Sequence, residues 1–233
     1  MPAVRDLTAA WHDLVLGGRC AACEEPGPAL CAGCRHGLRP RPFEAWPSPT
    51  PEGLVLPMAA AEYAGDVRAL VVAHKEHHRL ALARPLGELL AAAVLGVLDA
   101  TGAGGPVHLV PVPSHPAVVR ARRHDPLLRC TRCAAARLRR GGLEATVVRR
   151  LRVARRPGDQ AGLDAGARAA NVHDTLRARS APVRSEGGSW VVVDDVVTTG
   201  ATLREAQRAL EESGLVVTGA ATVAATRRRW GGT

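Results

Sequence analysis

The stretch SWVVVDDVVTTGATLREA (189–206) decides the fold of this chain. It begins with a wholly apolar run at 190–193, which is typical of a strand in the middle of a sheet covered on both faces. The predicted strand ends at Asp194, and Asp195 and a short loop of small and hydroxyl-bearing residues follow. A helix is predicted over 203–213. A buried strand, a short loop and a helix form the repeating unit of an α/β protein with a parallel sheet.

Segments of the same two kinds lie on both sides of this stretch. Apolar strands are predicted at 54–63, 107–113, 145–150 and 216–225, with a further short strand near 171–176. Helices are predicted over 66–75, 83–98 and 126–140. Because strands alternate with helices, we expect an α/β fold in which a parallel sheet is flanked by helices.

The residues after the strand at 190–194 can bind a phosphate and a sugar. In parallel α/β sheets, ligands lie outside the carboxyl ends of the strands. Residues 198–202 fall at that edge and open a helix, whose free backbone N–H groups attract a phosphate, and Gly200 permits a close approach of the ligand. Asp194 and Asp195 would repel the phosphate, so they suit the hydroxyl groups of a ribose or the water shell of magnesium. The alternative is a solvated turn followed by an ordinary helix cap.

Four cysteines near the N-terminus have the spacing of a metal site, C-x2-C-x7-C-x2-C. Zinc prefers four tetrahedral ligands, and thiolates suit it well. Because four thiolates leave no position for water, a zinc ion here would be structural rather than catalytic. The alternatives are two disulfides or four free thiols. The predicted ligands are Cys20, Cys23, Cys31 and Cys34.

Composition divides the chain into two parts. We expect residues 1–45 to hold a helix over 1–18 and the zinc knuckle, and residues 54–233 to form the larger α/β domain. The connector RPRPFEAWPSPTPEG is rich in proline and predicts a boundary at 40–53.

Two further groups of side chains resemble metal or redox sites. Cys130 and Cys133 face the same side of the helix at 126–140, and the prediction favoured here is a pair of small buried thiols rather than a redox or metal site. His74, His77 and His78 lie together, but no matching carboxylate spacing supports a metal site there.

The charge of the chain is uneven. The 233 residues carry 31 basic and 22 acidic side chains, a net charge of +9, and Lys75 is the one lysine. Residues 118–184 hold 17 arginines against five acids, a local net charge of +12. Such a segment suits the phosphates of a nucleic acid or a small polyanion. The segment has no aromatic residue, whereas proteins that bind single strands offer aromatic stacking platforms.

Neither a signal peptide nor a membrane span is predicted. Asp6, His12 and Asp13 interrupt any apolar region near the N-terminus. The most apolar run, 89–98, is shorter than the ~20 residues that a spanning helix needs. We therefore expect a cytoplasmic protein without membrane insertion.

The segment at 191–202 resembles the 5-phosphoribosyl-1-diphosphate (PRPP) motif of type I phosphoribosyltransferases. With this segment, the cysteine knuckle and four more stretches occur in the order seen in the ComF (competence protein F) family, and the resemblance covers about 20–226. The four stretches are VAHKEHHRLALARPLGELL (72–90), LVPVPSHP (109–116), RARRHDPLLR (120–129) and DQAGLDAGARAANV (159–172).

This resemblance implies a type I phosphoribosyltransferase fold and assigns roles to residues. Asp194 and Asp195 would hold the 2- and 3-hydroxyls of the ribose. The 5-phosphate would bind to Val197, Thr198, Thr199, Gly200, Ala201 and Thr202. The diphosphate loop would be Val112, Pro113 and Ser114. The remaining polar signature of the family matches Lys75, Arg123, Gln160, Arg168 and Asn171.

The predicted catalytic residues are Asp194, Asp195, Lys75 and Arg123. Lys75 and Arg123 would neutralise the negative charge of the diphosphate. Gln160 lies in a loop that could close over the diphosphate. The chain departs from the family at one of these positions. The family commonly has glycine where this chain has Arg123, so the shape of that turn and the role of Arg123 are left open.

By this resemblance, the chain would be a magnesium-dependent phosphoribosyltransferase that binds PRPP and an unidentified acceptor and carries structural zinc. The alternative is a non-catalytic protein of the same fold that serves DNA uptake, with single-stranded DNA or competence helicases as partners.

Overall fold

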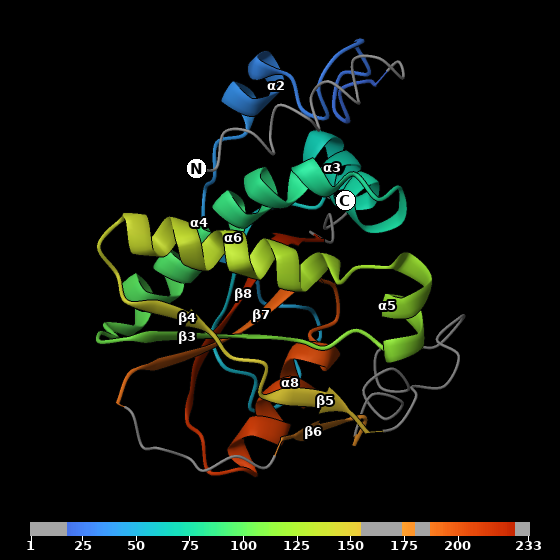
Figure 1. Cartoon of the computed structure of the whole chain (residues 1–233). Helices are drawn as coiled ribbons and strands as arrows, with labels where there is room; N and C mark the ends of the chain where they lie inside the picture. The colour runs from blue at the N-terminus through green and yellow to red at the C-terminus, as the bar shows by residue number, and fades with distance from the viewer. Residues whose placement is uncertain (1–17, 155–173, 180–186, 227–233) are drawn as a thin grey trace, which may run out of the picture.

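The computed structural model describes residues 18–154, 174–179 and 187–226 (Figure 1). Its elements, in chain order, are α2 (Ala32–Gly37), β1 (Phe43–Glu44), β2 (Pro57–Glu62), α3 (Gly65–Glu76), η1 (Leu80–Leu82), α4 (Ala83–Thr101), β3 (Val107–Pro111), α5 (Pro116–Arg122), α6 (Pro126–Arg140), β4 (Ala145–Val147), β5 (Leu151–Val153), β6 (Leu176–Ala178), β7 (Ser189–Val197), α8 (Ala201–Glu211) and β8 (Val217–Ala225). The helix predicted over 1–18 lies outside the described residues.

A six-stranded sheet forms the centre of the described chain, in the order β1-β2-β8-β7-β3-β4. From β2 to β4 every neighbouring pair is parallel, and the two-residue β1 pairs antiparallel with β2. The predicted α/β fold with a parallel sheet is therefore confirmed. The central strand is β7, whose apolar residues Val191 and Val193 are fully buried.

The two faces of the sheet are covered by different elements (Figure 1). Helices α4 and α6 lie on one face, and α8 with the β5–β6 hairpin lies on the other. Each face has its own apolar core: Leu90 and Val94 of α4 lie in the first, and Leu203 and Leu210 of α8 lie in the second. Burying one such side chain contributes about 1.5–3 kcal/mol.

Strand β7 is longer than the sequence predicts. The predicted strand ends at Asp194, but the observed strand continues through both acids to Val197. The reason is pairing with the neighbouring strand, because Val196 and Val197 lie opposite two alanines of β8. The two acids therefore belong to the last part of a strand rather than to a loop.

Short elements account for the other differences. Strand β4 ends three residues before the predicted end at 150. The strand expected near 171–176 is β6 at Leu176–Ala178, and it pairs antiparallel with β5 in a separate two-stranded sheet. Helix α5 and strands β1 and β5 were not predicted, because two to seven residues are too few to show a hydrophobic period.

The apolar helix on the first face is also longer than predicted. Residues Leu80–Thr101, which include η1 and α4, are long and apolar enough to cross a membrane by length and composition alone. The most apolar run alone, at 89–98, is too short to indicate such a helix. In the structure this helix packs against α6 and β8, and 61% of its most apolar window is buried, as in the core helix of a folded domain.

The cysteine knuckle and the connector pack against the helices that flank the sheet. Cys20, Ala29 and Leu30 belong to the same apolar core as α4. The connector is held by α8, because the side-chain amide of Gln207 donates to the carbonyl of Gly53 at 2.9 Å and its side-chain oxygen accepts the N–H of Val55 at 3.0 Å.

Helix α4 packs tightly against α6 at Gly87. A Cβ atom added there would lie 2.4 Å from Cys133 Cβ and 2.8 Å from the carbonyl oxygen of Cys130. Burial raises the pKa of the Cys130 thiol well above its ordinary value, so this thiol stays protonated. Both observations agree with small thiols that pack between helices.

We predict that Gly87→Ala destabilises the protein. Alanine favours a helix by up to ~1 kcal/mol, but the clash with α6 backbone costs about 1–3 kcal/mol, so the free energy of unfolding should fall. The matched control is Gly33→Ala in α2, where an added Cβ meets nothing within 4 Å. Urea unfolding measures the free energy of unfolding of both variants. Equal values for the two variants would contradict the close packing at Gly87.

Candidate functional site

The carboxyl end of β3 lies beside Val193 in β7, and β7 continues past it to Val197. Pro111 of β3 is the partner of Val193 in β7, and the N–H of Val112 donates to the carbonyl of Val193 at 3.0 Å. Residues 112–114, the predicted diphosphate loop, therefore begin next to Asp194. The parallel sheet brings these two segments together although about eighty positions separate them in the sequence.

Asp194 and Asp195 occupy adjacent positions near the end of β7. Each one accepts a hydrogen bond from the next backbone N–H, at 2.8 Å: Asp194 Oδ1 from Asp195, and Asp195 Oδ1 from Val196. These short bonds fix both side chains at the edge of the sheet.

Lys75 of α3 pairs with the second carboxylate. Its Nζ atom donates to Asp195 Oδ2 at 2.5 Å, and both side chains are partly exposed. Burial lowers the pKa of Lys75, but the neighbouring Asp195 carboxylate raises it more, so the net shift is upward. The ammonium group therefore stays charged and the pair is ionic.

The first carboxyl group has a different environment. Burial first, and then the negative charge of Asp195, raise the pKa of Asp194 to about 8, although the backbone N–H of Asp195 and the charge of Lys75 act in the opposite direction. At pH 7 Asp194 is therefore largely protonated in the free protein. Asp194 can accept hydrogen bonds with both of its carboxyl oxygens only when it loses its proton.

Helix α8 begins directly after this strand, at the predicted phosphate site. Its N-cap is Gly200, with φ of +72°, and the hydroxyl of Thr199 accepts the N–H of Ala201 at 3.5 Å. Thr198 is exposed and Thr199 is half-buried. The first N–H groups of a helix have no partner within the helix, so this end can bind an anion.

Gly200 has a second role that the sequence analysis did not predict. A Cβ atom there would lie 2.8 Å from Pro47 Cγ and 3.2 Å from Leu54 Cδ2. The connector, rather than a ligand, thus makes the close approach on that side of the glycine. The connector thereby helps to hold the loop that opens α8.

Arg123 lies at the end of α5 in the left-handed region, with φ of +54°. Glycine adopts this conformation most easily, and glycine is the residue that the resemblance led us to expect. The turn therefore keeps the backbone shape that glycine favours although arginine occupies it. Three further predicted residues, Gln160, Arg168 and Asn171, lie outside the described residues.

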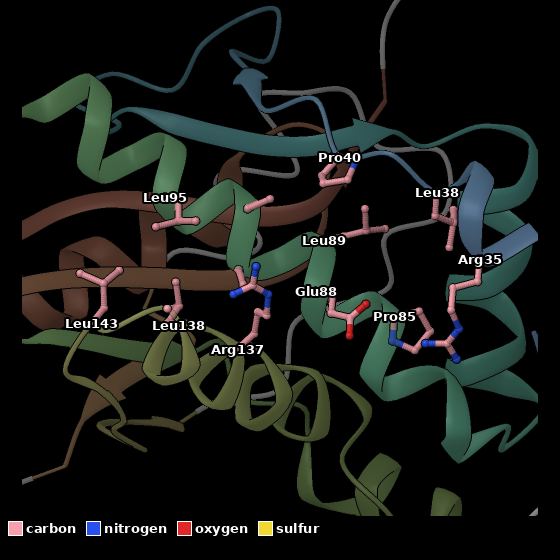
Figure 2. Close-up of a pocket in the computed structure, with 13 residues that line it drawn as sticks. Arg35, Leu38, Pro40, Pro85, Glu88, Leu89, Leu95, Arg137, Leu138 and Leu143 are labelled. Atoms are coloured by element: carbon pink, nitrogen blue, oxygen red, sulfur yellow. The ribbon is translucent and has the colours of Figure 1, made fainter. Parts of the chain in front are cut away.

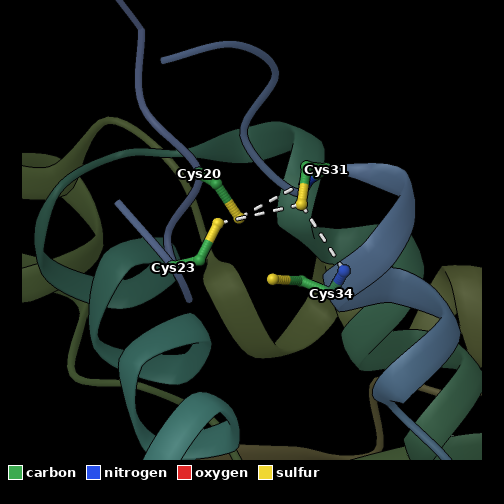
Figure 3. A group of neighbouring side chains, drawn as sticks. All are labelled: Cys20, Cys23, Cys31 and Cys34. Carbon is green, nitrogen blue, oxygen red and sulfur yellow. Dashed lines mark hydrogen bonds between the residues drawn. The ribbon is translucent and has the colours of Figure 1, made fainter. Parts of the chain in front are cut away.

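The four N-terminal cysteines converge (Figure 3). Their Sγ atoms all lie within 4.8 Å of one another, and those of Cys23 and Cys31 are 3.8 Å apart. Zn–S bonds of ~2.3 Å in a tetrahedron place sulfurs about 3.8 Å apart. Burial raises the pKa of Cys20, but backbone N–H groups, that of Cys31 first, lower it to about 6. The cluster is therefore compatible with structural zinc.

Two hollows lie near these elements. One, of about 420 Å³, lies between α2, α4 and α6 and is lined mostly by apolar side chains such as Leu89 and Leu138 (Figure 2). The other, of about 590 Å³, lies at the carboxyl end of β3 and includes the predicted diphosphate loop. Four arginines line the second hollow, and the sequence analysis missed them individually, although the charge of segment 118–184 pointed to them. They are Arg120, Arg149, Arg152 and Arg179.

Comparison with known proteins agrees with this geometry. No curated protein matches the chain. The model of the phosphoribosyl transferase domain matches residues 98–231, which include β3, β7 and the start of α8. This match covers more than half of the chain, and the chain belongs to the phosphoribosyl transferase domain family.

Proposed function

We propose that the protein binds PRPP with magnesium and transfers the phosphoribosyl group to an acceptor, as an enzyme of the ComF type. The observation that carries this proposal is the pair Asp194 and Asp195 at the end of β7, followed at once by the N-terminus of α8, in a chain of this family. The spacing suits a ligand with two adjacent hydroxyl groups and a terminal phosphate.

Each part of PRPP has a matching group in the site. The backbone N–H groups that open α8, with Thr198 and Thr199, would bind the 5-phosphate. Asp194 and Asp195 would accept hydrogen bonds from the ribose hydroxyls. Residues 112–114, which begin beside Asp194, would face the diphosphate.

The reaction requires charge stabilisation more than covalent chemistry. The bond from C1 to the diphosphate breaks as positive charge develops on the ribose, so the protein must hold the sugar and neutralise the leaving group. Asp194 and Asp195 lie where the ribose would be held, and Lys75 offers the positive charge nearest to them. Magnesium, carried in largely by the substrate, would add positive charge at the diphosphate oxygens.

A second candidate function is the handling of single-stranded DNA. The observation that favours it is the outer surface of α6, where Arg129, Arg132 and Arg140 are exposed. Within the part of the chain that the structure describes, none of these three forms an ion pair. Unpaired arginines along one helix suit a phosphate backbone.

We also propose that the cysteine cluster holds one structural zinc ion. The four thiolates would fill its coordination sphere and link the knuckle to the core shared with α4. Since a knuckle of this size buries little apolar surface, the metal would supply much of its stability.

The PRPP proposal predicts that Asp194→Asn/Asp195→Asn lowers the affinity for PRPP. Calorimetry with magnesium should show a loss of about 100-fold or more, because each lost hydrogen bond to a charged group costs ~1.5–3 kcal/mol. The control is Asp99→Asn/Glu144→Gln, which removes two exposed acids elsewhere. Equal heats of PRPP binding for the wild-type protein and both variants, or no heat for the wild-type protein, would reject PRPP binding at these acids.

The raised pKa of Asp194 predicts that PRPP binding depends on pH. The ligand requires the ionised carboxylate, but the free protein holds a proton there below about pH 8. Affinity should therefore rise by up to ~tenfold per pH unit as pH approaches 8, and level off above it. Asp194→Asn should keep only the pH dependence of PRPP itself. The prediction fails if the affinity for PRPP changes equally with pH, between pH 7 and 9, in the wild-type protein and in Asp194→Asn.

The zinc proposal predicts one zinc ion per chain. Cys23→Ser should lower the zinc content and the melting temperature, and a chelator should lower the melting temperature of the unchanged protein. Cys133→Ser makes the same chemical change outside the cluster and should keep the zinc. Elemental analysis that finds well under one zinc ion in the unchanged protein would reject the site.

A further inference from the structure

Three histidines lie together where the end of α3 meets the turn between α5 and α6. His74 lies in the last turn of α3, His78 follows that helix, and His124 lies in the turn before α6. The ring centroids of His74 and His124 are 5.9 Å apart, and those of His78 and His124 are 5.2 Å apart. We call these three residues the histidine cluster. The sequence alone groups His78 with His77, because His124 is far away in the chain.

His124 makes the hydrogen bond that is typical of a histidine that binds a metal ion. Its Nδ1 atom lies 2.7 Å from the carbonyl oxygen of Arg122, so Nδ1 carries the proton and donates it. Metal-binding histidines almost always donate one ring N–H in this way, and the other ring nitrogen binds the ion. In His124 that other nitrogen is Nε2, whose lone pair is available in the neutral ring.

The Nε2 atom of His124 is buried and has no hydrogen-bond partner among the described residues. The whole residue is only 8% exposed. A buried polar atom without a partner destabilises a fold, and in native proteins it commonly marks the place of a bound water or ion. The neighbouring His78 is exposed, so its side chain can move and admit an ion from solvent to this nitrogen.

The spacing of His78 and His124 suits one metal ion between them. Two imidazoles on a tetrahedral ion, with Zn–N bonds of ~2.0–2.1 Å, have ring centroids about 5 Å apart. The observed separation of 5.2 Å is close to this value. His74 is not available as a ligand, because its ring nitrogens face the carbonyl oxygens of Arg79 at 3.1 Å and Pro126 at 3.3 Å. The histidine cluster therefore offers two ligands to an ion.

The surroundings of this pair determine which kind of ion it suits. Among the described residues, the cysteine cluster is the one group of three or more converging metal-binding side chains, so no carboxylate joins the two histidines. Mg²⁺ and Ca²⁺ require oxygen ligands, whereas imidazole suits zinc, copper and nickel. The nearby Arg122 would repel a cation, but Glu76 pairs with it at 2.7 and 2.8 Å and offsets its charge.

We propose that His78 and His124 bind a divalent ion of a late transition metal, such as zinc or nickel, with water as the remaining ligands. The bound ion would join the end of α3 to the turn between α5 and α6. The proposal does not rest on the proposed function, because neither histidine is among the residues assigned to PRPP.

Nickel is the probe, because elemental analysis distinguishes it from zinc in the cysteine cluster. Calorimetry on the full chain, purified without a histidine tag, should show a nickel site that His78→Gln weakens by about tenfold or more. Because His78 is exposed, this variant leaves the core intact. His124→Gln should have the same effect. The matched control is His77→Gln, which removes an exposed imidazole from the next position and should leave the affinity for nickel unchanged.

Two further variants separate this site from the other candidate metal sites. Cys23→Ser and Asp194→Asn/Asp195→Asn should both keep the nickel site. Nickel should also raise the melting temperature of the wild-type protein, because it binds only the folded state, and this rise should be lost in His78→Gln.

Three results would overturn the proposal. The first is the absence of nickel binding in the wild-type protein. The second is an affinity for nickel that is equal in the wild-type protein and in His78→Gln. The third is a loss of nickel binding in the cysteine variant or in the variant of the two acids, which would place the ion in one of those sites.

Discussion

The ion pair between Lys75 and Asp195 joins two layers of the molecule at the site. Lys75 comes from α3 and Asp195 from the central strand β7, so the pair fixes the end of α3 over the carboxyl edge of the sheet. The pair also separates the roles of two neighbouring acids. Asp195 pairs with Lys75, whose pKa is raised, while burial keeps Asp194 largely protonated in the free protein.

The remaining parts of the site depend on the order of the strands. Because β3 and β7 are neighbours, the segment after β3 reaches the acids of β7. Because β7 leads directly into α8, the acids are followed by a helix N-terminus. The connector, which packs on Gly200 and is held by Gln207, keeps that helix start in place. The site proposed for a sugar, a phosphate and a diphosphate would thus be formed by three neighbouring chain segments.

The elements with a clear hydrophobic period could be predicted from the sequence. The helix over 126–140 agrees at both ends with α6, and the central strand was found from its run of valines. The extension of β7 to Val197 could not be predicted, because it depends on pairing with β8. The approach of Gly87 to α6 and the packing of Pro47 on Gly200 could not be predicted either, since both join residues far apart in the sequence.

The side chains at the site also divide into those that the sequence predicts and those that only the fold brings together. Asp194, Asp195 and the residues that open α8 were found because they are contiguous in one motif. The ion pair of Lys75 with Asp195 joins positions 120 residues apart, and only the fold reveals it. The hollow at the carboxyl end of β3 is a similar case, because its arginines come from α5, the segment between β4 and β5, β5 itself and the residue after β6. The sequence shows their number and sign but not their convergence.

The most direct test of the account is a crystal structure of the protein with PRPP and magnesium. We predict that the ribose hydroxyls lie within hydrogen-bond distance, ~2.5–3.0 Å, of the carboxylates of Asp194 and Asp195. The 5-phosphate should lie on the backbone N–H groups that open α8. A PRPP molecule bound elsewhere, with the ion pair of Lys75 and Asp195 unchanged and no ribose near β7, would contradict the account.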